Sequence, residues 1–407
     1  MNTFVENRAT ETREVEVDRI EDATFKLLAH CRSEDWSGYD PYDALNSELF
    51  AAVPVLDAKW PRLVFTQVLK RSPINFRPLL QVPKLQNPKA LALSLQALVR
   101  LRRIGRLDDR CLLDDLVSRL ARARSAGPYW SWGYSFPWQG RSILVQKDEP
   151  NLVCTTFVAE ALLDLFEETS DSRYLAMVES AGDYFVNELF WVDAEAVASF
   201  GYPNALAKSR VHNANLLAAA FLLRLHRHTG SDKARKVALR VATYSAGCQR
   251  PDGSWPYGEL RNQNWIDNFH TGYNLCALRR IAHYGGTNEF ESNIAKGYQF
   301  YRDHFLREDG APRYFHNRTY PIDVHCVAQS VLTLLEFANE DAGAAGRAHQ
   351  VLTWALDNLW DAQGYFYYQK TTWGTNTISY MRWAQAWMLL ALATFLERQA
   401  VESNHAA

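Results

Sequence analysis

A helical pattern that recurs every 56 to 64 residues constrains the fold of this chain more than any other feature. Each copy is a short apolar helical segment with small residues and a leucine-rich end. Aligning the copies on one leucine gives Leu98, Leu162, Leu222, Leu278, Leu334 and Leu390. More amphipathic segments lie between the copies, at 108–124, 173–188, 232–247, 289–305 and 344–359. A period of this length is typical of one helical hairpin with a long loop.

The alternation of apolar and amphipathic helices predicts an all-α (α/α)6 toroid, with the apolar helices inside. A chain of 407 residues is long for a single core unless the fold grows by repeating similar units. Six hairpins can close into a ring, which removes the two ends that an open helical solenoid, the alternative fold, must cap. We expect an irregular N-terminal cap at 1–50, the toroid at 51–397, beginning with outer-helix material at 55–70, and a C-terminal tail at 398–407.

The composition argues against several classes of protein. A net charge of −2 is unlike that of a nucleic-acid-binding protein. Residues 1–20 lack the apolar core of a secretory signal, and no segment is apolar enough to span a membrane, so we expect a cytoplasmic protein. The six cysteines are scattered without a CxxC pair, so we expect no disulfide framework and no zinc site. We also expect no other bound metal and no cofactor.

Polar residues recur where the inner helices should begin. Counting back eleven residues from each aligned leucine reaches Asn87, Asn151, Val211, Asp267, Asp323 and Ser379. The next three positions add His212, Asn213, His270, His325 and Tyr380. Helix capping alone explains the amides and the serine, and it could explain either aspartate. It does not explain three histidines beside the caps, so we predict a functional site where these helix ends converge.

The loops that lead into these helices are aromatic, whereas surface loops are normally polar. The chain has 13 Trp, 19 Tyr and 20 Phe. Three of the loops share an Asp and a Gly followed by aromatic residues, a tight turn that lays a ring against the barrel. Packing between hairpins explains at least half of these rings, and the others should line a cleft. Aromatic faces combined with carboxylates, amides and imidazoles suit an oligosaccharide or polysaccharide ligand.

Three motifs carry a resemblance to a known family: WIDNFHTGY at 265–273, WGYSFPWQ at 132–139 and GYDPYD at 38–43. With them the chain resembles, over nearly its whole length, bacterial proteins encoded among surface-polysaccharide biosynthesis genes. That family looks like a branch of the six-hairpin glycosidase superfamily. The resemblance implies an (α/α)6 toroid and a carbohydrate-active enzyme of surface-polysaccharide metabolism. It assigns no catalytic residue, and it leaves open a contact with polysaccharide assembly proteins.

Two kinds of acid–base chemistry fit the predicted catalytic residues, which are Asp267, His270, Tyr273, Asp323 and His325. In a glycoside hydrolase, Asp267 and Asp323 would flank the glycosidic bond as acid and as base or nucleophile. In a uronate lyase or C5-epimerase, a histidine would remove the proton beside the carboxylate, a tyrosine would act as the acid, and an arginine would bind the carboxylate. A non-catalytic glycan-binding component of a polysaccharide assembly system is the alternative.

A second set of residues is expected to bind the substrate around the predicted mouth. Its members are Trp132, Trp138, Asn151, Tyr202, His212, Asn213, Trp255, Arg261, Trp265, Trp373 and Tyr380. We expect several of the tryptophans, together with Tyr202, to be partly exposed on one side of the ring, because clustered exposed aromatic residues mark binding surfaces.

Overall fold

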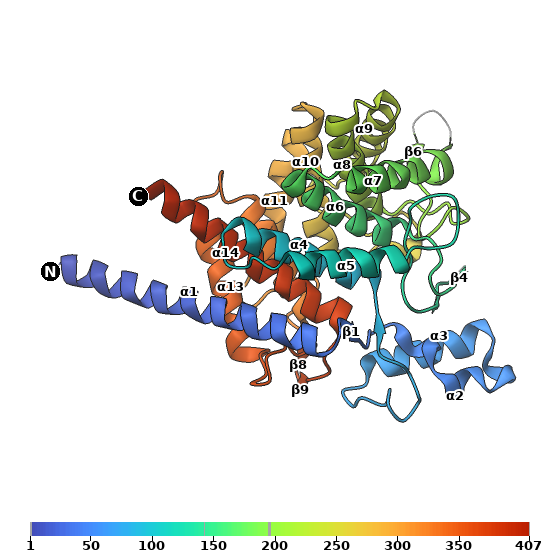
Figure 1. Ribbon diagram of the computed structural model, residues 1–407, viewed down its shortest axis with the longest axis horizontal. Helices are drawn as coiled ribbons and strands as arrows, with labels where there is room; N and C mark the ends of the chain where they lie inside the picture. The colour runs from blue at the N-terminus through green and yellow to red at the C-terminus, as the bar shows by residue number, and fades with distance from the viewer. Residues whose placement is uncertain (1, 142, 194–196, 407) are drawn as a thin grey trace.

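A closed ring of six helices forms the centre of the molecule. The computed structural model describes residues 2–141, 143–193 and 197–406 (Figure 1). Each inner helix packs against the next, and the last packs against the first. The predicted (α/α)6 toroid is therefore confirmed, and each aligned leucine lies in its own inner helix. The inner helices are α4 (Pro88–Arg103), α6 (Leu152–Thr169), α8 (His212–Thr229), α10 (Asn268–Gly285), α12 (Val324–Glu336) and α14 (Ala386–Ala406).

Six further helices surround this ring, and each packs mainly against one inner helix. Each of them buries its apolar face and exposes its polar face, as the amphipathic sequence pattern predicts. In chain order they are α1 (Asn2–Ser33), α5 (Arg110–Arg122), α7 (Ser172–Tyr184), α9 (Asp232–Gly247), α11 (Glu291–Phe305) and α13 (Ala344–Asn358).

The first outer helix differs from the sequence-based expectation of an irregular cap at residues 1–50. α1 packs against α14 and α13, so the sixth hairpin combines the two ends of the chain (Figure 1). Ile20, Leu27 and Cys31 are fully buried on the face that packs. The repeat could not reveal this helix, because its inner partner lies at the other end of the sequence. Residues 398–406, expected as a tail, continue α14.

Short elements between α1 and α4 form a lobe beside the ring. It contains β1 (Ser37–Gly38), η1 (Asp43–Asn46), α2 (Glu48–Ala51), η2 (Pro54–Leu56), α3 (Lys59–Arg71) and β2 (Leu85–Gln86). β1 pairs with β2, and α3 packs mainly against η1. The segment 55–70, expected to be outer-helix material, thus lies outside the ring, and Trp60, Val64 and Val68 of α3 are exposed.

The remaining strands are short antiparallel pairs in the loops between hairpins. β3 (Trp138–Gln139) pairs with β4 (Leu144–Val145), and β5 (Phe190–Asp193) pairs with β6 (Val197–Phe200). β8 (Gln369–Thr371) lies between β7 (Ile322–Asp323) and β9 (Gly374–Asn376). Three short helical turns, η3 (Phe185–Leu189), η4 (Arg261–Gln263) and η5 (Met381–Gln385), complete the list of elements.

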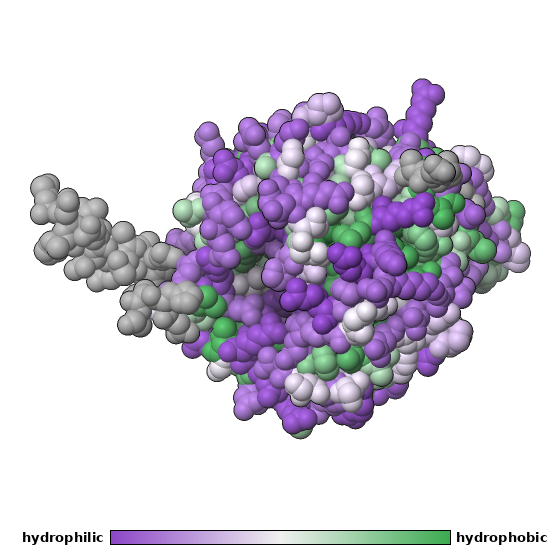
Figure 2. Space-filling view, turned by 90° about the horizontal axis from the view of Figure 1, so that it is seen from above, coloured by the Kyte–Doolittle hydropathy of each residue, from purple (hydrophilic) through white to green (hydrophobic). Residues whose placement is uncertain are grey.

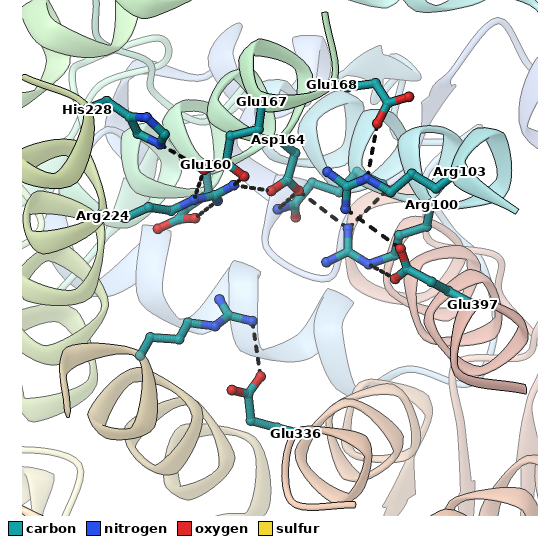
Figure 3. Close-up of polar contacts among 12 residues, drawn as sticks. Arg100, Arg103, Glu160, Asp164, Glu167, Glu168, Arg224, His228, Glu336 and Glu397 are labelled. Carbon is teal, nitrogen blue, oxygen red and sulfur yellow. Dashed lines mark hydrogen bonds and ion pairs between the residues drawn. The ribbon is translucent and has the colours of Figure 1, made fainter. Parts of the chain in front are cut away.

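Arginines and acids pair across neighbouring inner helices near their C-terminal ends (Figure 3). Arg100 of α4 contacts Glu397 of α14 at 3.5 Å and Asp164 of α6 at 3.4 Å. Arg224 of α8 pairs with the same Asp164 at 2.6 Å. Although burial alone would raise the pKa of Asp164, Arg224 and Arg100 hold it at about 2. The pairs therefore stay ionised and connect four helices. Figure 3 also labels Arg103, Glu160, Glu167, Glu168, His228 and Glu336.

One face of the molecule can be judged for its polarity. The face seen from above Figure 1 is largely hydrophilic, and its hydrophobic residues lie in separate groups (Figure 2). Among the described helices, none has the length and apolar character needed to cross a membrane.

One close approach in the inner ring yields a stability prediction. A Cβ atom on Gly272 of α10 would lie 2.6 Å from Thr333 Oγ1 and 2.8 Å from Gln329 Cγ of α12. Overpacking of this kind costs about 1–3 kcal/mol, so Gly272→Ala should lower the free energy of unfolding by that amount in denaturant titrations. Gly346 lies in α13, and a Cβ atom added there would have no atom within 4 Å. Gly346→Ala is therefore the control, and it should stabilise the protein by about 0.5–1 kcal/mol. Equal effects of the two substitutions would contradict the close packing of α10 on α12.

Candidate active site

The N-terminal ends of the inner helices meet at one mouth of the ring. The residues that cap α4, α6, α8, α10 and α12 are Asn87, Asn151, Val211, Asp267 and Asp323, as the register predicts. Every one except Val211 accepts a hydrogen bond from the backbone of its own helix. In the last hairpin the register is one residue off, since Tyr380 rather than Ser379 precedes the helical turn η5.

A cleft of about 740 Å³ opens at this mouth. Its wall combines the inner helix ends, the aromatic loops between hairpins, and α3 of the N-terminal lobe. Of the predicted catalytic residues, Asp267, His270, Tyr273 and His325 line it. Of the predicted binding residues, Trp138, Tyr202, Asn213 and Trp265 line it. The cleft volume falls within the usual range for sites that bind small molecules.

Asp267 and His270 form a hydrogen-bonded pair on the first turn of α10. Asp267 Oδ1 accepts the backbone N–H of His270 at 3.0 Å, which caps the helix. Asp267 Oδ2 lies 2.7 Å from His270 Nδ1 and 3.0 Å from the indole nitrogen of Trp265. A carboxylate accepts, so Nδ1 carries the proton of the neutral ring and Nε2 is left with its lone pair. Nε2 has no hydrogen-bond partner in the part of the chain that the structure describes, and the side chain is 20% exposed.

A second imidazole, that of His325 on α12, lies deeper in the cleft. It is 1% exposed, and its Nε2 lies 2.6 Å from the hydroxyl of Tyr273. Burial lowers the pKa of His325 well below its usual value, and Lys89 and Arg382 lower it further. His325 is therefore neutral at neutral pH. The ring of Phe269 lies between the two imidazoles, 4.2 Å from that of His270 and 4.7 Å from that of His325.

Basic side chains outnumber carboxylates around the cleft. Among the described residues, Asp267 supplies the one carboxylate in the lining. The basic residues of the lining are Lys70, Arg71, Lys89, Arg318 and Arg382. Arg382 is buried and donates hydrogen bonds of 2.6 and 2.8 Å to the two carboxylate oxygens of Asp40, which hold its guanidinium in place. Asp40 balances the charge of Arg382, but Lys70, Arg71 and Arg318 still outnumber the one carboxylate of the described lining, and this balance favours an anionic ligand.

Lys89 is the most unusual of these basic residues. It is 3% exposed, and its Nζ lies 4.0 Å from the ring centroid of Phe157 and 5.0 Å from that of Trp387. Burial, with a smaller effect from Arg382, lowers the pKa of Lys89 well below its usual value. An anion beside Nζ would favour the charged ammonium form, because an opposite charge at short range raises the pKa of an amine.

Asp323, predicted as a catalytic acid or base, does not line the cleft. It is 1% exposed, and its Oδ1 accepts the backbone N–H of His325 at 2.9 Å and the indole N–H of Trp383 at 3.0 Å. Trp383 itself lines the cleft. Asp323 therefore caps α12 and, by accepting the indole N–H of Trp383, holds that ring in the wall of the cleft.

Seven of the predicted binding residues also lie outside the cleft. Trp132 and Trp255 are buried in the core, where their indole nitrogens donate to backbone carbonyls of Leu120 and Ser245. Trp373 is 97% exposed, at the turn between β8 and β9. The others are Asn151, His212, Arg261 and Tyr380. The spacing of aromatic residues in the sequence could not show which rings line the cleft, because the same loops supply rings to the core and to the cleft.

Several lining residues were not among those predicted from the repeat. Lys89 comes from the second position of α4, and its burial could not be read from a segment that looks like an ordinary helix start. Tyr42, Lys70 and Arg71 come from the lobe that was expected to be a cap and outer helix. Tyr257 stacks on Trp265 with ring centroids 4.5 Å apart, and it lies in a loop whose aromatic residues were the available signal.

The buried carboxyl of Asp323 yields a prediction about pH. Burial raises the pKa of Asp323 to about 7, from an ordinary value of 3.8. A carboxyl with a raised folded-state pKa stabilises the fold below its unfolded-state pKa and loses this contribution as the pH rises through the folded-state value. Asp323→Asn keeps the Oδ1 acceptor without the buried charge. Denaturant titrations above about pH 7 should find the variant at least as stable as the wild type, with less loss of stability between about pH 4 and 8. A variant that is less stable than the wild type only at the higher pH would contradict this assignment.

No family model matches the chain, and no curated protein matches its sequence. Solved structures share its fold. A cellobiose 2-epimerase from Bacillus thermoamylovorans aligns with a TM-score of 0.61 at 9% identity, over 77% of this chain and 88% of that one. A cellobiose 2-epimerase from Spirochaeta thermophila aligns with a TM-score of 0.58 at 12% identity, over 78% and 87%. A GH76 alpha-mannanase from Bacteroides thetaiotaomicron aligns with a TM-score of 0.59 at 10% identity, over 79% and 87%. At these identities the likeness shows the (α/α)6 fold.

Proposed function

We propose that this chain is an enzyme of epimerase type that moves a proton on a carbon next to the carbonyl or carboxylate group of an acidic sugar. The observation that carries the proposal is the Asp267–His270 pair, which presents a free imidazole nitrogen to a basic cleft. A positioned base beside groups that stabilise an anion is the arrangement that carbon deprotonation needs.

Each of these side chains has its own role in the proposed reaction. His270 Nε2 removes the proton, and Asp267 stabilises the imidazolium that forms. Lys89 and Arg382 stabilise the negative charge that develops on the sugar oxygen. The hydroxyl of Tyr273, hydrogen-bonded to His325, returns a proton to the same carbon. His270 and Tyr273 then exchange protons with water, which restores the starting state.

Glycoside hydrolysis fits this cleft less well. Two carboxyl groups must flank the glycosidic bond in that reaction, one of them protonated. Asp267 already accepts three hydrogen bonds, and Asp323 lies behind Trp383. The second carboxyl is therefore missing from the described lining of the cleft.

Two similarities, one of structure and one of sequence, support a role in sugar metabolism. The names of two structural neighbours, cellobiose 2-epimerases, describe sugar epimerisation on this fold, although a GH76 alpha-mannanase shares it too. The resemblance of the three sequence motifs supports a role in surface-polysaccharide metabolism, where a cytoplasmic enzyme would meet the acidic sugar before export. The alternative, a non-catalytic glycan-binding component, would bind such sugars without proton exchange.

Replacement of the base tests the proposal. The protein should exchange a carbon-bound hydrogen of an acidic sugar for deuterium in D2O, measured by proton NMR on a panel of uronic acids and oligosaccharides that contain them. His270→Asn should lower the exchange rate on the order of 10²–10⁴-fold, the usual contribution of a general base. His283→Asn, on the exposed surface of the same helix, is the matched control and should exchange normally. Sugar binding without exchange in the wild type would instead support the binding module, and release of free sugar would support hydrolysis.

Asp267→Asn separates catalysis from capping. Asparagine caps a helix as well as aspartate does, so the melting temperature should fall by no more than a few degrees. Its NH2 group would face two donors, His270 Nδ1 and the indole of Trp265, so the imidazole would lose its orientation. We expect exchange to slow on the order of 10²-fold or more. Asp109→Asn, at the cap of the outer helix α5, is the control. Normal exchange in Asp267→Asn would reduce Asp267 to a cap.

A further inference from the structure

Three side chains with metal-binding atoms meet behind one wall of the cleft. They are His212 at the start of α8, Cys248 at the end of α9, and Glu259 in the loop that leads to α10. One ligand atom from each lies within 4.8 Å of the other two. The sulfur of Cys248 lies 3.8 Å from Glu259 Oε1, close to the separation of two ligands on one small metal ion.

His212 has surroundings that core packing does not explain. Its side chain is fully buried, and neither ring nitrogen has a hydrogen-bond partner among the described residues. A buried polar atom without a partner is costly, and native proteins rarely keep one without a reason. Here the imidazole faces a thiol and a carboxylate, which are the other two side chains that commonly bind zinc.

We propose that His212, Cys248 and Glu259 bind one Zn²⁺ ion. A nitrogen, a sulfur and an oxygen donor together suit a borderline-soft ion such as Zn²⁺ better than Mg²⁺ or Ca²⁺, which prefer oxygen ligands. Binding breaks the S–H bond of Cys248, releases that proton to solvent and forms a zinc–thiolate bond. Water, or the hydroxyl of Tyr244 that already contacts Glu259, supplies the fourth ligand.

The surroundings of the site allow the ion to enter from solvent and balance its charge. The Glu259 side chain is 29% exposed, so the ion can enter from solvent. Arg210 binds Glu259 Oε2 at 3.0 Å, which orients the carboxylate and leaves Oε1 directed at the sulfur. Thiolate and carboxylate together match the two positive charges of the ion.

The ion would join the start of α8 to the loop that forms one wall of the cleft. Gly258 already pairs with Val211, and the backbone N–H of Glu259 bonds to Arg210. The same loop carries Tyr257 and Trp265, which line the cleft. His212, which the sequence placed among the substrate-binding residues, thus acquires a positioning role, and the site does not depend on the proposed reaction.

Metal titration of the full chain tests the site. After treatment with a chelator, the protein should bind one equivalent of ZnCl2, release about one proton and melt at a higher temperature. CoCl2 should produce an absorption band for charge transfer from thiolate to cobalt. Cys248→Ser should lose the band and the thermal shift. Cys111→Ser, at an exposed cysteine, is the matched control and should keep both.

His212 is fully buried, so its replacement would disturb the fold as well as the site, whereas Glu259 can be replaced at the surface. Glu259→Gln should weaken Zn²⁺ binding by roughly tenfold or more, because even residues that only support a ligand change affinity by that factor. Its circular dichroism spectrum before metal addition should match that of the wild type. The proposal is overturned by a charge-transfer band that persists in Cys248→Ser, by the absence of any band, or by weak binding of several ions that none of the substitutions changes.

Discussion

Closure of the inner ring is the constraint on which the rest of the structure depends. Each inner helix has an inner helix on both sides and an outer helix behind it, so nearly its whole surface is covered. This accounts for inner helices that are apolar all round, and for small residues such as Gly272 where two backbones approach closely. The pairing of α1 with α14 joins the two ends of the sequence and closes the ring.

Closure also makes the two mouths of the ring chemically different. All inner helices point the same way, so the positive ends of their dipoles converge on the cleft and the negative ends on the opposite mouth. Arg100, Arg224 and Arg280 lie near the C-terminal ends and carry the charge that such ends favour. At the cleft, Lys70, Arg71 and Arg318 add to the positive field. The helix direction and the side chains thus favour the same kind of ligand, an anionic one, at a single mouth.

The fold could be predicted from the sequence because a repeat carries the same information six times. The register placed Asp267, Asp323 and three further caps correctly, since N-caps obey a local rule. The cleft was harder to predict, because burial depends on neighbours that are distant in sequence. Asp323 differs from Asp267 through Trp383, which lies 60 residues farther along the chain and covers it. The N-terminal lobe gave no repeat, so its contribution to the cleft could not be foreseen.

The proposed reaction requires His270 to present an unprotonated Nε2 to an anionic sugar, and nitrogen-15 NMR of the histidine side chains can detect this state. We expect His270 to be the tautomer with the proton on Nδ1, held there by Asp267. We also expect its Nε2 to change its chemical shift when a uronic acid is added. A ring protonated on Nε2, or a His270 spectrum that saturating uronic acid leaves unchanged, would rule out His270 as the base.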